Sequence, residues 1–383
     1  MEEIDRLLKN ISEEGLLRQL RPITFRKGGN IYFGDKKFLD FSSNDYLGLA
    51  GHPRLKESAK ETIDLLGTSS SASRLLSGDF EIHHRLEEEV ARFKNKESAL
   101  IFNSGYQANI GILSALYTKS DVIFSDRLNH ASIVDGIFLS RAVSFRFRHN
   151  DLSHLESILE KERHKYKKAL IVTETIFSMD GDRASLRELV NLKDKYNCHI
   201  MVDEAHATGI FGQRGSGLVE EEGLADSIDL IMGTFSKALG SYGAYLATSK
   251  KIVDYLINTC RSFIYSTALP PAVIASSLAG IKLVAEEPNR RKSLLECSGF
   301  FRNELKKRGF AVRGDSHIVP LIIGENFKTM EFARRLQAKG YWVLPVRPPT
   351  VPHGQSRLRF SLTVYHHREI LQELINEISS LGI

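Results

Sequence analysis

The sequence is poor in several features that mark specialised classes of protein. Only three cysteines, Cys198, Cys260 and Cys297, are spread along 383 residues, so neither a disulfide framework nor a zinc site is indicated. No apolar run approaches the roughly 20 residues that cross a bilayer. The acidic start, Met-Glu-Glu-Ile-Asp, lacks the apolar core of a signal peptide. These absences predict a cytoplasmic protein that holds no metal and has no membrane partner.

Several catalytic motifs are also missing. The chain has no Gly-Lys dipeptide and therefore no phosphate loop, so the segment Asp203-Glu-Ala-His is not a helicase magnesium box. It has no Gly-x-Ser-x-Gly elbow, no His-Glu-x-x-His and no complete Gly-x-Gly-x-x-Gly. The motifs that identify serine hydrolases, zinc proteases and dinucleotide-binding proteins are therefore absent. The net charge of +5 is mild, and without a Lys/Arg-rich block it indicates no nucleic-acid partner.

The central region alternates apolar runs with segments of helical periodicity. An apolar content of 42% and a charged content of 26% are ordinary for a globular enzyme. Because the apolar runs are nearly continuous, both faces of their sheet should carry helices. The pattern predicts a three-layer α/β/α domain with a mainly parallel sheet. The expected strands are Ser98–Phe102, Asp121–Phe124, Leu170–Thr173, Ile200–Asp203 and Leu230–Gly233.

Two flanking regions differ from this pattern. Residues 2–20 predict a short amphipathic helix, and residues 30–41 a hairpin around a Gly-Asp turn. After residue 286, strands and helices mix in an order that predicts a small α+β domain with a largely antiparallel sheet. The expected division is therefore residues 1–50 as an N-terminal helix and hairpin, 51–285 as the large domain and 286–383 as the small C-terminal domain.

A lysine and an aspartate each follow a predicted buried strand. Lys237 lies in Gly233-Thr-Phe-Ser-Lys-Ala-Leu-Gly, and Asp203 ends the strand before it. A lysine amine can form a Schiff base with pyridoxal phosphate, and a carboxylate can keep the pyridine nitrogen of that cofactor protonated. Ligands of open α/β sheets collect where the strands end. Most lysines are simply solvated, however, and an isolated aspartate at a strand end is about as often a helix cap.

Other polar groups are expected at the same edge of the sheet. The turn Asn103-Ser-Gly-Tyr opens a helix whose backbone amides could bind a phosphate, although an ordinary turn would look the same. His130 could stack on a flat ring, but a lone histidine is more often a surface or core residue. Glu174 and Ser178 follow another strand, in what could be only a solvated loop.

Five stretches together carry a family resemblance. They are Phe41-Ser-Ser-Asn-Asp-Tyr-Leu-Gly-Leu, Asp126-Arg-Leu-Asn-His-Ala-Ser-Ile-Val-Asp-Gly, Phe177-Ser-Met-Asp-Gly-Asp, Val202-Asp-Glu-Ala-His-Ala-Thr-Gly and Gly233-Thr-Phe-Ser-Lys-Ala-Leu-Gly. Over essentially its whole length the chain resembles the α-oxoamine synthases, a branch of the fold-type I pyridoxal-phosphate-dependent transferases. The resemblance implies pyridoxal 5'-phosphate as cofactor and a homodimer with shared active sites.

The resemblance also implies a role for each candidate residue. Lys237 would form the Schiff base, Asp203 would pair with the pyridine nitrogen, and His130 would stack on the ring and contact substrate. The other cofactor-binding residues would be Gly105, Tyr106, Glu174, Ser178, His206 and Thr234, with Ser266 and Thr267 reaching across from the neighbouring subunit. The other substrate-binding residues would be Arg18, Asn44, Thr350 and Arg359.

Within the family, one segment indicates the substrates. Arg347-Pro-Pro-Thr-Val-Pro followed by Ser356-Arg-Leu-Arg favours the member that joins L-alanine to a pimeloyl thioester in biotin synthesis. The acyl carrier, pimeloyl-CoA or pimeloyl-ACP, stays open. Glycine C-acetyltransferase is the nearest alternative, followed by other α-oxoamine synthases that act on succinyl or palmitoyl thioesters. A pyridoxal-phosphate aminotransferase is a more distant alternative. One departure from the family pattern is Gly67-Thr-Ser-Ser-Ser-Ala-Ser-Arg, where relatives carry a glycine-rich segment.

Overall fold

A computed structural model describes residues 1–382 of the chain, which folds into two compact units. The large unit comprises residues 49–177 and 183–291. The small unit gathers residues 1–48, 178–182 and 292–383 from three separate parts of the chain. The sequence-based division after residues 50 and 285 stays a prediction.

The large unit is built on a seven-stranded sheet with the order β4-β10-β9-β8-β7-β5-β6. Only β10 runs antiparallel to its neighbours β4 and β9, so the expectation of a mainly parallel sheet is confirmed. The strands are β4 (Ser98–Phe102), β5 (Val122–Asp126), β6 (Val143–Phe147), β7 (Ala169–Glu174), β8 (His199–Asp203), β9 (Leu230–Thr234) and β10 (Ala244–Thr248).

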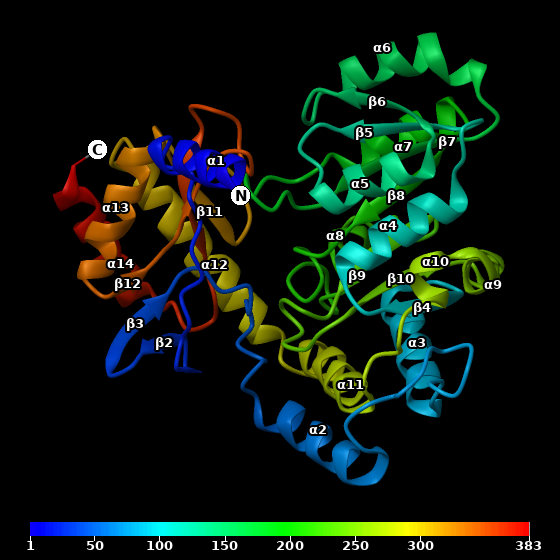
Figure 1. Cartoon of the computed structure of the whole chain (residues 1–383), viewed down its shortest axis with the longest axis horizontal. Helices are drawn as coiled ribbons and strands as arrows, with labels where there is room; N and C mark the ends of the chain where they lie inside the picture. The colour runs from blue at the N-terminus through cyan, green and yellow to red at the C-terminus, as the bar shows by residue number, and fades with distance from the viewer. Residues whose placement is uncertain (383) are drawn as a thin grey trace. The chain divides into compact units, whose positions relative to one another are not determined.

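Both faces of this sheet are buried. Alternate strand residues such as Leu100, Leu170 and Met201 share one apolar cluster with residues of α4 (Gly105–Leu116), α5 (Ala131–Ser140), α9 (Lys250–Thr259) and α10 (Arg261–Ile264). The intervening residues, among them Ile171 and Ile200, are equally buried. Because strand neighbours point to opposite faces, a second helical layer must cover the other side; α3 (Glu81–Lys94) and α7 (Leu186–Lys195) contact strands β4 and β8 there. This is the expected three-layer arrangement (Figure 1).

Two strands of the sheet fall outside the sequence-based prediction. Strand β6 forms an edge of the sheet, and its sequence Val-Ser-Phe-Arg-Phe is exposed at most positions, so it lacks the continuous apolar run of a central strand. Strand β10 is fully buried and as long as β8 and β9, and it comes directly after the turn that carries Lys237. The five expected strands agree with the structure to within two residues at each end.

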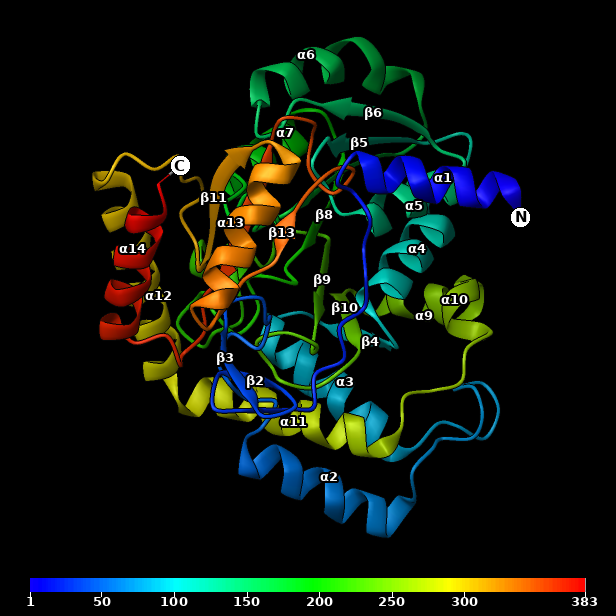
Figure 2. The same ribbon diagram turned by 60° about the vertical axis from the view of Figure 1, so that its left-hand side comes forward.

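The large unit has five further helical segments. They are α2 (Pro53–Leu66), α6 (Leu152–Glu162), η1 (Arg163–Lys165), α8 (Leu218–Glu221) and α11 (Pro271–Glu286). Helices α4 and α5 lie side by side in both ribbon views (Figures 1 and 2). Among residues 1–382, the structure has no helix that is both long and apolar enough to cross a membrane.

The small unit contains two sheets. Helix α1 (Glu2–Glu13) ends earlier than the expected residue 20, and β2 (Asn30–Phe33) with β3 (Lys36–Asp40) forms the expected hairpin between β1 (Phe25–Lys27) and β12 (Tyr341–Trp342). The second sheet, of order β11-β14-β13, is antiparallel, as expected. Its strands are β11 (Ile318–Gly324), β13 (Pro345–Val346) and β14 (Ser356–Ser361), and the unit's other helices are α12 (Pro288–Lys307, whose first turn belongs to the large unit), α13 (Asn326–Ala338) and α14 (Arg368–Leu381).

Candidate active site

The chemically active groups of the large unit lie where its parallel strands end. Asp203 is the last residue of β8, Glu174 the last of β7, and Thr234 the last of β9, three residues before Lys237. His130 is the N-cap of α5, which follows β5. Because β5, β7, β8 and β9 are adjacent and parallel, these groups share one edge of the sheet.

Asp203 is a buried carboxylate with both oxygens held. Its Oδ1 accepts a hydrogen bond from the Ala205 backbone N–H at 2.9 Å, and its Oδ2 accepts one from Asn109 Nδ2 at 3.0 Å. Only 5% of the residue is exposed. Because donors hold both oxygens, the structure fixes the position and direction of this carboxyl group at the end of β8.

His130 lies within electrostatic range of both Asp203 and Lys237. The residue is exposed, but its Nδ1 points inward, 2.8 Å from Ser132 Oγ. Desolvation of this inner edge lowers the pKa of His130; the charge of Lys237 lowers it further, whereas Asp203 and Asp135 raise it. The imidazole is therefore held neutral, with an open ring surface beside a carboxylate and an amine.

The turn that carries Lys237 is tightly packed at its end. Gly240 has φ +65°, and a Cβ there would lie 2.5 Å from the backbone of Leu49 and Ala50. Thr234 is 4% exposed, and its hydroxyl is engaged with the Gly243 carbonyl at 2.7 Å. The predicted phosphate contact at Thr234 would therefore require this internal hydrogen bond to be exchanged or shared.

The start of α4 presents free backbone donors. The N-cap Ser104 accepts from the Gln107 backbone N–H at 3.2 Å, but the N–H groups of Gly105 and Tyr106 have no acceptor among the described residues. The Tyr106 hydroxyl bonds Asp135. Two such N–H groups at a helix N-terminus suit an anion. The phosphate contact at Gly105 and Tyr106 stays a prediction.

Three further predicted residues of the large unit lie in its connecting turns. Ser266 Oγ accepts from Gln107 Nε2 at 2.6 Å, and the Thr267 carbonyl accepts from Asn103 Nδ2 at 2.8 Å, so both lie against the Asn103–Gln107 turn of their own chain. His206 is 6% exposed in the turns after β8. Whether Ser266 and Thr267 also reach a second subunit stays a prediction.

The predicted substrate-binding residues other than His130 all belong to the small unit, where they form two groups. Arg359 on β14 bonds Asn44 Oδ1 at 3.3 Å, and it also donates to the Ser178 carbonyl. Arg18 donates to Thr350 Oγ1 at 3.2 Å. The structure therefore brings Asn44, Ser178 and Arg359 together, and Arg18 and Thr350 together.

Arg359 is a buried cation that has no carboxylate partner among residues 1–382 as the structure describes them. It is 9% exposed, and its described partners are the neutral oxygens of Ser178, Asn44, Tyr46 and Ser361. Arg357, two residues earlier on the same strand, is 1% exposed but pairs with Asp180 at 2.8 Å. A buried guanidinium that lacks an anion is a candidate binding site for one.

The sequence interpretation missed four residues that support these groups. Asn109 and Ser132 bond Asp203 and His130, while Tyr46 and Asp180 hold the two arginines of β14. Asn109 and Ser132 lie close in sequence to predicted site residues, three positions after Tyr106 and two after His130. Spacing on a helix could have placed them beside the site, but not their hydrogen-bond partners.

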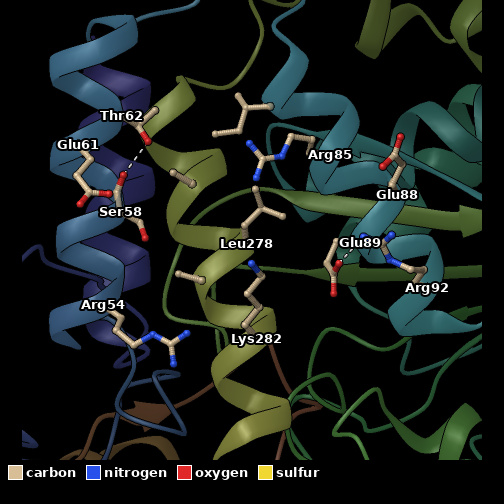
Figure 3. Close-up of a pocket in the computed structure, with 13 residues that line it drawn as sticks. Arg54, Ser58, Glu61, Thr62, Arg85, Glu88, Glu89, Arg92, Leu278 and Lys282 are labelled. Carbon is tan, nitrogen blue, oxygen red and sulfur yellow. Dashed lines mark hydrogen bonds and ion pairs between the residues drawn. The ribbon is translucent and has the colours of Figure 1, made fainter.

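A wide groove elsewhere in the large unit contains none of these residues. It has a volume of about 380 Å³ and lies between α2, α3 and α11 (Figure 3). Arg54, Arg85 and Lys282 line it together with Glu61, Glu88 and Glu89. Among the described residues, no group of three His, Cys, Asp or Glu side chains could hold a metal ion.

The groups at the sheet edge fit pyridoxal phosphate. An exposed imidazole face suits a flat ring, a buried acceptor-only carboxylate suits a protonated ring nitrogen, two unused backbone N–H groups suit a phosphate, and Lys237 supplies an amine. An α/β/α unit with a mainly parallel sheet and a small antiparallel unit is the architecture of fold-type I enzymes of this cofactor class.

Comparison with known proteins agrees with this architecture. The aminotransferase class I and II family matches residues 36–378. The 8-amino-7-oxononanoate synthase of Geotalea daltonii is 46% identical over 378 residues, which cover 98% of this chain and 96% of the relative. That of Geobacter sulfurreducens is 47% identical, with the same coverage of both chains. A serine palmitoyltransferase of S. paucimobilis with a bound PLP–myriocin aldimine superposes with a TM-score of 0.93 at 28% identity, covering 99% of this chain and 96% of that one.

The chain therefore belongs to the aminotransferase class I and II family. Its relatives of high identity and nearly full coverage are 8-amino-7-oxononanoate synthases.

Proposed function

We propose that this chain is a pyridoxal-phosphate-dependent acyltransferase that condenses L-alanine with a pimeloyl thioester. The products are 8-amino-7-oxononanoate, carbon dioxide and the free thiol carrier, a step of biotin biosynthesis. The proposal is supported by relatives of this name that are 46–47% identical over 98% of the chain. It is supported equally by the amine, carboxylate and imidazole that meet at the sheet edge.

One observation carries the choice of an amino acid as substrate: the buried Arg359 guanidinium has no carboxylate partner among the described residues. A planar guanidinium binds a carboxylate through two parallel hydrogen bonds, which also fixes the orientation of that group. An α-carboxylate held in this way would have its Cα bonds in a defined direction, and orientation of this kind is a large part of catalysis.

Residues of the large unit would transfer the substrate proton and keep the cofactor ring protonated. When bound, the cofactor supplies an electron sink for the carbanion that forms at the alanine Cα. Lys237 Nζ would take the Cα proton and later return one to the product. Asp203 would hold a proton on the ring nitrogen, because its two oxygens are fixed and buried. His130 would stack on the cofactor ring and so fix the plane in which that ring lies.

We also propose that two copies of the chain form the active enzyme. Four large apolar side chains of the large unit are strongly exposed: Phe138 by 82%, Leu65 and Leu76 each by 80%, and Tyr265 by 72%. Exposed apolar surface of this kind marks interaction sites, and Tyr265 precedes the predicted cross-subunit pair Ser266–Thr267. Light scattering should report twice the chain mass of 43.1 kDa; a monomer with full activity would contradict the shared site.

The cytoplasm is the proposed compartment. All three cysteines are free thiols, and Cys198 and Cys260 are buried. Burial raises the pKa of the Cys198 thiol to about 11 and also raises that of Cys260. Unpaired thiols of this kind are usual in a reducing compartment.

Mass spectrometry of the reaction product tests the function directly. The holoenzyme is incubated with L-alanine and pimeloyl-CoA, with L-alanine and pimeloyl-ACP, and with glycine and acetyl-CoA. We expect 8-amino-7-oxononanoate in at least one of the first two mixtures, and the better of the two identifies the carrier. Faster product formation from glycine and acetyl-CoA than from either pimeloyl substrate would overturn the proposal.

A further inference from the structure

A buried hydrogen-bond network joins Asp203 to His130 through two residues with no assigned role. Asn109, on α4, is 1% exposed, and its Nδ2 lies 3.0 Å from Asp203 Oδ2 and 2.9 Å from Ser132 Oγ. Ser132, on α5, is also 1% exposed, and its Oγ lies 2.8 Å from His130 Nδ1. The network therefore connects the carboxylate to the imidazole in three steps.

The direction of each hydrogen bond follows from the chemistry of Asp203. A carboxylate can only accept, so the amide of Asn109 must turn Nδ2 towards Asp203. Its second N–H then points to Ser132 Oγ. Ser132 accepts there, so its own proton is free to point to His130 Nδ1. The Ser132 backbone N–H, 3.3 Å from the same nitrogen, is a second donor.

Two features of the fold accompany this network: one unsatisfied buried oxygen and one close approach between helices. Asn109 Oδ1 is buried without a hydrogen-bond partner among the described residues, and a buried unsatisfied acceptor destabilises a protein. Gly136 on α5 faces α4 closely: a Cβ there would lie 2.8 Å from the Asn109 carbonyl oxygen. The two helices can therefore lie close together (Figure 2). This lets Asn109 reach Ser132.

We infer that Asn109 and Ser132 are positioning residues that hold His130 as the neutral tautomer with its proton on Nε2. Two donors meet at Nδ1, so that nitrogen cannot carry the proton, and the ring is fixed in direction relative to Asp203. The inference rests on the proposed function for the role of His130, but the tautomer itself is a property of the protein alone.

The charges around His130 agree with a neutral ring. Desolvation and the charge of Lys237 lower the pKa of His130, against the opposing effects of Asp203 on β8 and Asp135 on α5. Tyr106 on α4 bonds Asp135, which takes up part of that carboxylate's hydrogen-bonding capacity. Loss of the Ser132 hydroxyl removes a donor that opposes protonation of Nδ1 and should raise the pKa of the ring.

The test compares Ser132→Ala, Ser132→Thr and Ser114→Ala in the holoenzyme. Ser114, on α4, donates to the Ile110 carbonyl at 2.6 Å outside the network, so its variant controls for loss of a helix hydroxyl. For Ser132→Ala we expect kcat to fall about tenfold with KM for alanine changed less than about twofold, the size of effect of one lost hydrogen bond. The acidic limb of the pH profile should move up by about one unit. Ser132→Thr, which keeps the hydroxyl, should restore both, and Ser114→Ala should change neither.

The tautomer is measured independently of turnover by ¹⁵N NMR of histidine-labelled protein, with His130 assigned from a His130→Gln sample. We expect Nδ1 to resonate as an unprotonated ring nitrogen and Nε2 as a protonated one. A proton on Nδ1 in the wild type would overturn the inference, and so would a Ser132→Ala variant with an unchanged pH profile. If the wild type makes no 8-amino-7-oxononanoate, the proposed function fails, while the NMR result still decides the tautomer.

Discussion

The two arginines of β14 offer a matched pair of substitutions with opposite expected results. Both are buried and lie two residues apart, but Arg357 is paired with Asp180, whereas Arg359 has only neutral partners. Replacing each by leucine keeps an apolar stem on the strand and removes the charge. Arg357→Leu should damage stability, and Arg359→Leu should damage substrate binding.

The size of each effect follows from the contacts. Arg357→Leu leaves the Asp180 carboxylate without its buried partner, which typically costs about 3–5 kcal/mol. Because Arg313, half exposed, still lies 3.2 Å from Asp180, we expect the lower end, about 3 kcal/mol. Arg359→Leu removes a buried cation that no anion compensates. Removal of this uncompensated charge is favourable and offsets the loss of hydrogen bonds to neutral oxygens. The free energy of unfolding should therefore change by less than about 1 kcal/mol.

Catalysis should depend on Arg359 more than on Arg357. Two charge-assisted hydrogen bonds to a substrate carboxylate contribute roughly 4 kcal/mol together. Arg359→Leu should therefore lower kcat/KM for alanine by about 10³-fold. Urea unfolding and initial-rate kinetics on both variants measure the two quantities. If Arg359→Leu were as unstable as Arg357→Leu and kept the wild-type KM for alanine, Arg359 would be a structural residue and the argument from its missing anion would be refuted.

Three further outcomes are expected. Lys237→Ala should abolish turnover and the borohydride-reducible visible absorbance; survival of either would remove the lysine from its proposed role. Asp203→Asn should keep the hydrogen bond from Ala205 and the fold but lower kcat by several orders of magnitude, as seen in rates and circular dichroism, and a near-normal rate would mean that another group protonates the ring. Burial lowers the pKa of His366 to about 3, so the unfolded chain binds the proton first as the pH falls below about 6.5. Stability should therefore decrease by about 2–3 kcal/mol between about pH 7 and pH 4.5. Urea unfolding at both pH values should show this loss in the wild type and a smaller one in His366→Asn; equal losses would exclude His366 as the cause.

The central strands can be predicted because burial on both faces leaves a continuous apolar run in the sequence. Ile200–Asp203 and Leu230–Gly233 are recognisable for this reason, and the groups that follow them can be placed at one edge of the sheet. Strand β6 at the sheet edge has no such run, because solvent covers much of it. Helix α1 ends at Glu13 instead of residue 20: Gly15, with φ +67°, takes a conformation that a helix does not allow.

The partners of the site residues cannot be predicted in the same way. The contact between Asn109 and Asp203 depends on where α4 lies against β8, 94 residues away in the chain. The pairing of Arg357 with Asp180 joins residues 177 positions apart. Side-chain periodicity reports burial, but it does not say which buried polar groups meet, since that is decided by the packing of whole elements.

The discontinuous small unit has a consequence for how the protein forms during synthesis. Its residues 1–48 leave the ribosome first, yet they pack with residues 292–383, and the Asp180 segment must wait for Arg357. The large unit needs nothing beyond residue 291 and can fold earlier. Until residues 292–383 have been made, the hairpin of β2 and β3 has no lasting partner. A chain that stalls before that point should expose the hairpin to proteases and chaperones.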